Sequence, residues 1–152
     1  MRKYTQYNYE FSKKYDAFVV GSDQVWHNWS KSEQELKYFF LDFVEQKKRI
    51  CLSPSFGFDK IPEEFKAEYI EGLKGFKFLS CREKSGCDLI EKLIGKKAEL
   101  LIDPTMMLSA KEWDIIATKP EYDTPPNYIL VYFLGDMGEK AKEEVYKLAE
   151  EK

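Results

Sequence analysis

The first group of residues that could do chemistry follows a short apolar run from Asp16 to Gly21. The run predicts a buried strand, and Ser22, Asp23 and Gln24 stand directly after it. Asp23 and Gln24 are natural partners for sugar hydroxyl groups, and the nearby Trp26 offers a flat face for a sugar ring. The alternative is a turn in which Ser22 or Asp23 bonds its own backbone while Trp26 fills the core. The sequence leaves both interpretations open.

A second group follows the predicted strand 76–81. Arg82 can hold a phosphate or carboxylate with two hydrogen bonds, and Glu83 can orient it. Ser85 opens the next predicted helix, where backbone N–H groups can bind an anion. The alternative is an ion pair between Arg82 and Glu83 that only holds the loop together.

A third group is the single acid Asp103, which follows the predicted strand 98–102 and precedes Pro104. Ligands of open α/β sheets bind at the carboxyl ends of the strands, so polar residues at all three strand ends are site candidates. The alternative for Asp103 is a turn or helix cap.

Composition narrows the class of protein. The chain has 152 residues, a net charge of −3 and 43% hydrophobic residues, which predicts a globular protein without a nucleic-acid partner. Three cysteines and one histidine lack metal-site spacing, so we expect free, buried thiols, a reducing compartment and no metal. Dinucleotide and P-loop fingerprints are absent, so no cofactor is expected. No signal peptide or membrane-length apolar run is present, and we expect a cytoplasmic protein.

The predicted elements alternate between strand and helix, which indicates an α/β fold, a Rossmann-like parallel sheet with flanking helices. Glu63 and Glu64 follow Pro62 and mark a helix start, and Gly95 marks a helix end. The other expected elements are a strand or short helical turn at 38–44, a strand at 49–56, a helix after a capping box at 109–112, and a last helix capped by Asp136.

The proline-rich stretch 119–127 predicts a linker between two domains. Residues 1–118 then form a partial N-terminal Rossmann-like domain, and 128–152 begin a second one with an apolar strand from Tyr128 to Leu134. One strand and one helix cannot cover both faces of a parallel sheet. We therefore expect the chain to be a fragment of a longer protein and inactive by itself.

Several motifs agree in order and spacing with one family. They are YDAFVVGSDQVW at 15–26, FLSCREKSG at 78–86, AELLIDPTMMLSAKEWDIIA at 98–117 and YILVYFLGD at 128–136, with YFFLDFV and KRICLSPSFGFDKIPEEF between the first two. This series resembles the polysaccharide pyruvyl transferases. The resemblance implies a two-domain fold similar to GT-B glycosyltransferases. It also implies transfer of the pyruvyl group of phosphoenolpyruvate to a sugar of a cell-surface polysaccharide, forming a ketal.

The resemblance also implies roles for the strand-end residues. Phosphoenolpyruvate, the donor substrate, carries a phosphate and a carboxylate, for which Arg82 is the best-placed clamp. Asp23 is the candidate for positioning the acceptor sugar or acting as a base. The expected partners are a sugar or polysaccharide precursor, with peripheral contact to a lipid-linked glycan and no integral membrane segment. The alternatives are a GT-B-type glycosyltransferase and a non-catalytic glycan-binding module.

The chain departs from the family pattern in two places. His27 and Asn28 stand where Asn-Pro or a similar pair is expected after the tryptophan. The opening strand–helix unit of the family, with its glycine-rich loop, has no counterpart before the first strand.

Overall fold

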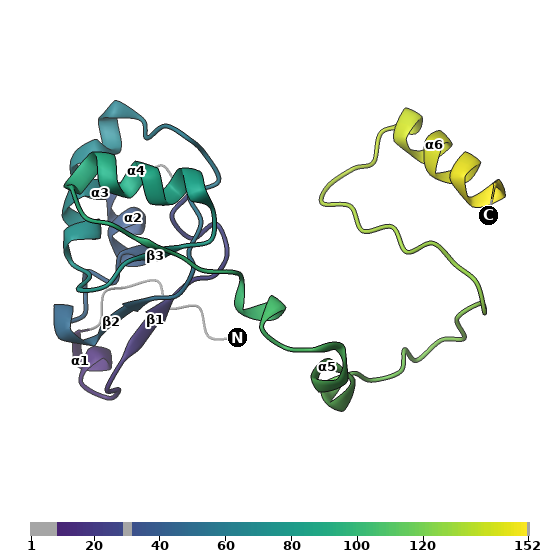
Figure 1. The fold of residues 1–152 in the computed structure, drawn as a ribbon, viewed down its shortest axis with the longest axis horizontal. Helices are drawn as coiled ribbons and strands as arrows, with labels where there is room; N and C mark the ends of the chain where they lie inside the picture. The colour runs from purple at the N-terminus through teal and green to yellow at the C-terminus, as the bar shows by residue number, and fades with distance from the viewer. Residues whose placement is uncertain (1–8, 29–31, 152) are drawn as a thin grey trace. The chain divides into compact units, whose positions relative to one another are not determined.

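The computed structural model describes residues 9–28 and 32–151. They form two compact units, one up to Glu112 and the other from Trp113 onward. Figure 1 labels their helices and the strands β1, β2 and β3. The predicted linker 119–127 lies in a stretch without helix or strand, from 117 to 138.

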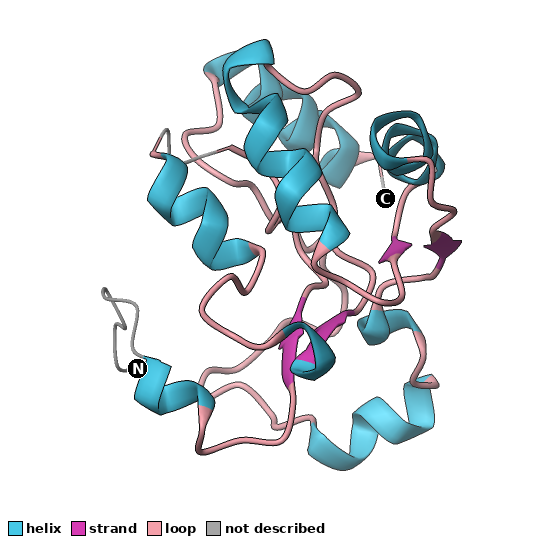
Figure 2. Cartoon of the chain, turned by 90° about the vertical axis from the view of Figure 1, so that its left-hand side faces the viewer, coloured by secondary structure: helices cyan, strands magenta, loops and turns pink. Residues whose placement is uncertain are grey.

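The first unit is built on two small parallel sheets. β1 (Phe18–Val20) pairs with β2 (Arg49–Cys51), and β3 (Ser80–Cys81) pairs with β4 (Glu99–Leu100). The register places Val20 opposite Cys51 and Cys81 opposite Leu100. A helix separates the two strands of each pair along the chain, as parallel pairing requires. The predicted α/β character is confirmed, although the strands are short beside the helices (Figure 2).

The Ser80 side chain and one backbone hydrogen bond join the two sheets. The Ser80 hydroxyl donates to the carbonyl of Cys51 at 2.9 Å and accepts from the N–H of Ser53 at 2.9 Å. The Arg82 N–H donates to the carbonyl of Pro54 at 3.2 Å. β2 and β3 therefore lie side by side, and the four strands follow one another in chain order.

Turns and capping residues determine where the helices begin and end. The predicted start after Pro62 is confirmed by a 3₁₀ turn at Glu63–Phe65 that leads into α3. α4 ends at Gly95, which adopts the left-handed conformation (φ 68°) that glycine tolerates best. The Ser109 hydroxyl accepts from the N–H of Glu112, and Glu112 accepts from the N–H of Ser109, which confirms the capping box. The helices are α1 (Tyr9–Ser12), α2 (Glu33–Phe39), α3 (Lys66–Lys74), α4 (Lys84–Ile94), α5 (Ala110–Ile116) and α6 (Glu139–Glu150).

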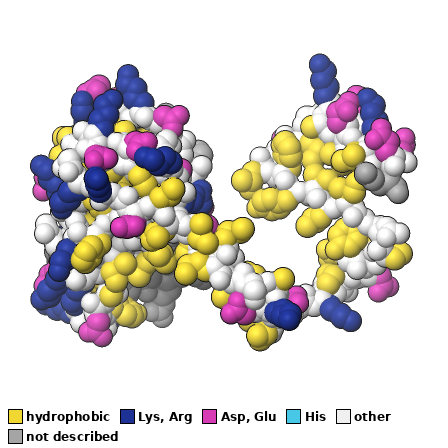
Figure 3. All heavy atoms as spheres, in the orientation of Figure 1, with side chains coloured by type: hydrophobic (Ala, Val, Ile, Leu, Met, Phe, Trp, Pro, Cys, Tyr) yellow, Lys and Arg dark blue, Asp and Glu magenta, His cyan; other side chains and the backbone are white. Residues whose placement is uncertain are grey.

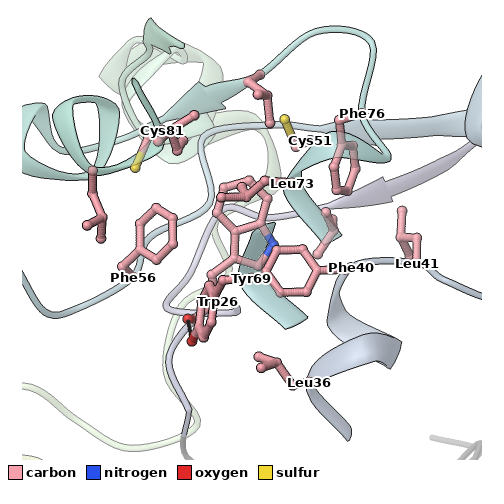
Figure 4. Packing of buried hydrophobic residues seen from close by; sticks show 14 of the residues in the cluster. Trp26, Leu36, Phe40, Leu41, Cys51, Phe56, Tyr69, Leu73, Phe76 and Cys81 are labelled. Atoms are coloured by element: carbon pink, nitrogen blue, oxygen red, sulfur yellow. Dashed lines mark hydrogen bonds between the residues drawn. The ribbon is translucent and has the colours of Figure 1, made fainter. Parts of the chain in front are cut away.

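Trp26 lies at the centre of the core of the first unit, with 0% of its surface exposed. Its ring stacks on Phe40 at a centroid distance of 5.5 Å and contacts Phe56 and Phe76 (Figure 4). The hydroxyl of Tyr69 donates to the Trp26 carbonyl at 2.5 Å. Large buried rings supply much of the hydrophobic stabilisation of a unit this small.

The three cysteines are free and buried, as the sequence predicted. Burial raises the pKa of Cys81 to about 12 and also raises the pKa of Cys51 and Cys87. The thiols therefore stay protonated and behave as small apolar side chains.

Three predicted elements differ from the structure. The stretch 38–44 is not a strand: it is the end of α2 followed by turns, which was the helical alternative. The helix α6 is present, but Gly138 and not Asp136 occupies its N-cap, and no side chain caps it. The polar stretch 26–34 has no apolar periodicity, which predicts a loop, but α2 already begins at Glu33 with the Ser32 side chain as its cap; residues 29–31 lie outside the described ones.

The predicted strand from Tyr128 to Leu134 is also not formed. No strand is assigned there, and all seven apolar side chains are exposed. A strand requires a neighbour for its backbone hydrogen bonds, and none of the described residues pairs with this segment. Figure 3 shows apolar side chains gathered on the surface of this second unit. No helix in the described part of the chain is long and apolar enough to cross a membrane.

Candidate functional site

The carboxyl ends of the four strands of the first unit open onto one edge. Backbone bonds continue past the strands: Leu52 donates to Val20, Arg82 to Pro54, and Leu101 to Cys81. Each loop therefore leaves its strand beside the loop of the neighbouring strand. This is the edge at which open α/β sheets bind ligands.

Four of the predicted site residues meet at this edge, and we call them the strand-edge cluster: Ser22, Asp23, Arg82 and Asp103. Ser22 Oγ donates to Asp103 Oδ2 at 2.7 Å. The Arg82 guanidinium lies 3.3 Å from Asp103 Oδ2 and 3.6 Å from Asp23 Oδ1. Residues from three strand ends, spread over 81 positions of sequence, thus form one connected group.

Asp103 is the anchor of the cluster. Besides Ser22 and Arg82, its carboxylate accepts from the Thr105 N–H at 3.0 Å and from the Thr105 hydroxyl at 2.7 Å. The hydrogen bond from Ser22, those from Thr105 and the one from Arg82 hold the pKa of Asp103 well below its usual range. Asp103 stays ionised, so it positions its neighbours and does not exchange protons near neutral pH. It also caps the 3₁₀ turn Pro104–Met106, so the cap alternative holds as well.

Asp23 is the exposed member of the cluster, with 88% of its side chain accessible against 30% for Arg82. Its Oδ1 also accepts from the N–H of Gln24 at 2.7 Å, the turn contact that the sequence left open. Among the described residues, no hydrogen bond reaches Asp23 Oδ2. One carboxylate oxygen is therefore fixed and the other is available to a ligand.

Backbone contacts fix the loop that carries Ser22 and Asp23. The Asp23 carbonyl accepts from the N–H of Ser55 at 3.0 Å, and the Trp26 N–H donates to the Ser55 carbonyl at 3.1 Å. Gly21 has a φ of 127°, and a Cβ there would lie 1.9 Å from the carbonyl oxygen of Leu52. Only glycine fits this close approach between the two loops.

The structure places two further predicted residues away from the cluster. The ring of Trp26 is fully buried, as in the core alternative, so it presents no face to a sugar. The Gln24 side chain lies against Gly57, where a Cβ would be 2.8 Å from its Cδ atom. Gln24 contributes to the site through its backbone N–H.

Glu83 and Ser85 also take positions other than the expected ones. Glu83 Oε1 accepts from the N–H of Phe56 at 2.8 Å, so this carboxylate braces the neighbouring loop. The anionic partners of Arg82 are Asp103 and Asp23 rather than Glu83. Ser85 is exposed in the first turn of α4, and no described contact joins it to the cluster.

Two residues that support the site were not predicted from sequence. Thr105 follows Asp103 by two positions, the spacing of a turn in which an aspartate accepts from the backbone, and that signal was available. Ser80 gave no local signal, since its partners Cys51 and Ser53 lie far away in the sequence.

Comparison with known proteins identifies the family of the chain. A family model described as polysaccharide pyruvyl transferase matches residues 1–151. No curated protein and no solved structure matches the chain significantly. With nearly every residue covered by one family model, the chain belongs to the polysaccharide pyruvyl transferase family.

Proposed function

We propose that the protein of which this chain forms at least a part transfers the pyruvyl group of phosphoenolpyruvate to a sugar of a cell-surface polysaccharide, forming a cyclic ketal. Membership of the family supports the transferase activity. The observation that carries the proposal further is the strand-edge cluster, which places an exposed carboxylate, Asp23, at the ligand-binding edge of the sheet.

The proposed reaction sets clear demands on the site. Two sugar hydroxyl oxygens form bonds to C2 of phosphoenolpyruvate, C3 gains a proton and becomes a methyl group, and the bond from C2 to the phosphate oxygen breaks. The two hydroxyl protons are released, one matched by the proton gained at C3 and the other leaving with phosphate or to solvent. A carboxylate of the enzyme that is held near the sugar can accept a hydrogen bond from each hydroxyl group and orient it for attack.

The cluster divides these tasks between its two acids. Asp103 is saturated with donors and fixes Ser22 and Arg82. Asp23 is held on one oxygen by Arg82 and by the N–H of Gln24, which leaves the other oxygen to receive a sugar hydroxyl. We infer that Asp23 positions the acceptor and that Asp103 and Arg82 position Asp23.

The proposal extends to architecture and location. We infer a Rossmann-like first domain in a GT-B-like parent, with the acceptor cleft at the edge that carries the cluster. We also infer a cytoplasmic enzyme that needs no cofactor and meets its acceptor as a lipid-linked precursor at the membrane surface.

Phosphate release tests the proposal directly. The parent protein is incubated with phosphoenolpyruvate and a panel of glycan acceptors, and we expect phosphate only when a suitable acceptor is present. Asp23→Asn should lower kcat/KM by about 10²-fold or more, the size typical of a lost positioning or acid–base group. Asp16→Asn is the matched control, because this exposed acid lies just before β1 while Asp23 lies just after it. Turnover of nucleotide sugars without any use of phosphoenolpyruvate would instead establish an ordinary glycosyltransferase.

A further inference from the structure

The charge of the strand-edge cluster bears on which substrate it binds. Its only cation, Arg82, lies between two carboxylates, at 3.3 Å from Asp103 and 3.6 Å from Asp23. One positive and two negative charges leave a net charge of −1. A phosphate or carboxylate at Arg82 would have to approach both acids as well.

The hydrogen-bonding groups of the cluster also disfavour an anionic ligand. Asp103 is already saturated by Ser22, Thr105 and Arg82. The accessible group is Asp23 Oδ2, on a side chain that is 88% exposed. An ionised carboxylate only accepts hydrogen bonds, so a ligand here must donate them. Sugar hydroxyl groups donate, whereas the ionised groups of phosphoenolpyruvate only accept.

We propose that the strand-edge cluster binds an uncharged sugar ring of the acceptor and disfavours anions, both the donor and acidic sugars such as uronic acids. This inference rests on the proposed function and adds the class of acceptor to it. The phosphate and carboxylate of phosphoenolpyruvate then bind to cations outside the cluster. Arg82 acts on Asp23 and is a positioning residue rather than the donor clamp that the sequence predicted.

The expected discrimination is modest, because the cluster is exposed to solvent. One net charge about 4 Å from a ligand charge gives about a fivefold difference in affinity in a water-like environment, which corresponds to about 1 kcal/mol. The difference should shrink as salt is added, since exposed charges are screened over about 10 Å at 0.1 M.

Paired ligands that differ in a single charge test this inference. Methyl hexosides and the methyl uronosides of the same ring configuration are titrated into the isotopically labelled protein at low salt, alongside phosphoenolpyruvate. Amide chemical shifts of Ser22, Asp23 and Thr105 report binding at the cluster. The variants are Asp23→Asn, which brings the net charge to zero, and the matched Asp16→Asn.

We expect at least one hexoside to shift the cluster signals and its uronoside to bind about fivefold more weakly. Asp23→Asn should weaken the hexoside and bring the affinity ratio close to one, while Asp16→Asn leaves the ratio unchanged. Cluster shifts caused equally by uronosides or by phosphoenolpyruvate would overturn the inference, as would an absence of shifts with every hexoside. Hexoside binding at the cluster without phosphate release would refute the proposed reaction and leave the inference standing.

Discussion

The Ser22 hydroxyl donates a 2.7 Å hydrogen bond to Asp103 Oδ2, joining residues 81 positions apart. Ser22 follows β1 and Asp103 follows β4, two strands that do not pair with each other. The other described partners of this carboxylate are Arg82, after β3, and Thr105 in its own turn. The bond from Ser22 therefore ties the first strand-end loop to the last one.

Asp103→Asn is expected to lower the free energy of unfolding at neutral pH and to lower it less at acid pH. Hydrogen bonds from Ser22 and Thr105 hold the pKa of Asp103 below its usual range, so the folded protein binds this proton more weakly than the unfolded chain. The stabilisation is complete above the unfolded pKa of about 3.9 and is lost as the pH falls toward the folded value. Urea denaturation between pH 7 and pH 2 measures the difference in unfolding free energy. Asp16→Asn is the control, and a wild-type-to-variant difference that grows in acid would contradict the assignment.

Gly21→Ala is expected to lower the free energy of unfolding by about 3 kcal/mol or more. The new Cβ would overlap the Leu52 carbonyl oxygen, 1.9 Å away, and the φ of 127° adds strain. Gly95→Ala is the matched control, because Gly95 also has a positive φ (68°) but nothing lies within 4 Å of its Cβ position. That variant should lose only about 1 kcal/mol. Equal losses of unfolding free energy for the two variants would show that the close approach of the two loops does not contribute to stability.

Trp26→Ala is expected to cost about 3–5 kcal/mol of unfolding free energy, because it removes the largest fully buried ring. Phe78→Ala, at a ring that is 78% exposed in the same unit, should change stability by less than about 0.5 kcal/mol. Denaturation followed by far-UV circular dichroism measures both. A stable, folded Trp26→Ala protein that had lost only glycan binding would instead support a direct role of the ring in a glycan-binding module.

Ser80→Ala is expected to cost about 1–3 kcal/mol, because it leaves the Ser53 N–H and the Cys51 carbonyl without their partner. Ser53→Ala provides the contrast. Ser53 is also buried, but its own hydroxyl has no partner among the described residues, so the loss of this hydroxyl should be neutral within about 0.5 kcal/mol. If the two variants behave alike, the hydroxyl of Ser80 does not join the two sheets.

The sequence predicted best the features that depend on neighbouring residues. Gly95 ended α4, and Ser109 with Glu112 formed a capping box, because caps depend on residues within one turn. The apolar runs before Asp23, Arg82 and Asp103 placed these residues at strand ends, and the carboxyl ends of parallel strands meet at one edge of the sheet. Their convergence agrees with that rule.

Features that depend on distant partners were not predictable in this way. Trp26 follows the same strand as Asp23, but the rings that bury it come from the C-cap of α2 and from loops further along the chain. The bridge through Ser80 has partners 27 and 29 residues away. The segment 128–134 has the composition of a buried strand, yet composition cannot supply the neighbouring strand that its backbone requires.

The link between β3 and α4 consists of two residues, Arg82 and Glu83. Glu83 is tied to the N–H of Phe56, and a Cβ at Gly86 would lie 2.3 Å from the sulfur of Cys81, so the helix packs tightly against the strand. The backbone of Arg82 therefore loses little conformational entropy when a ligand binds. Binding at Asp23 should order few protein groups, and weak contacts to single hydroxyl groups can then suffice to orient a sugar.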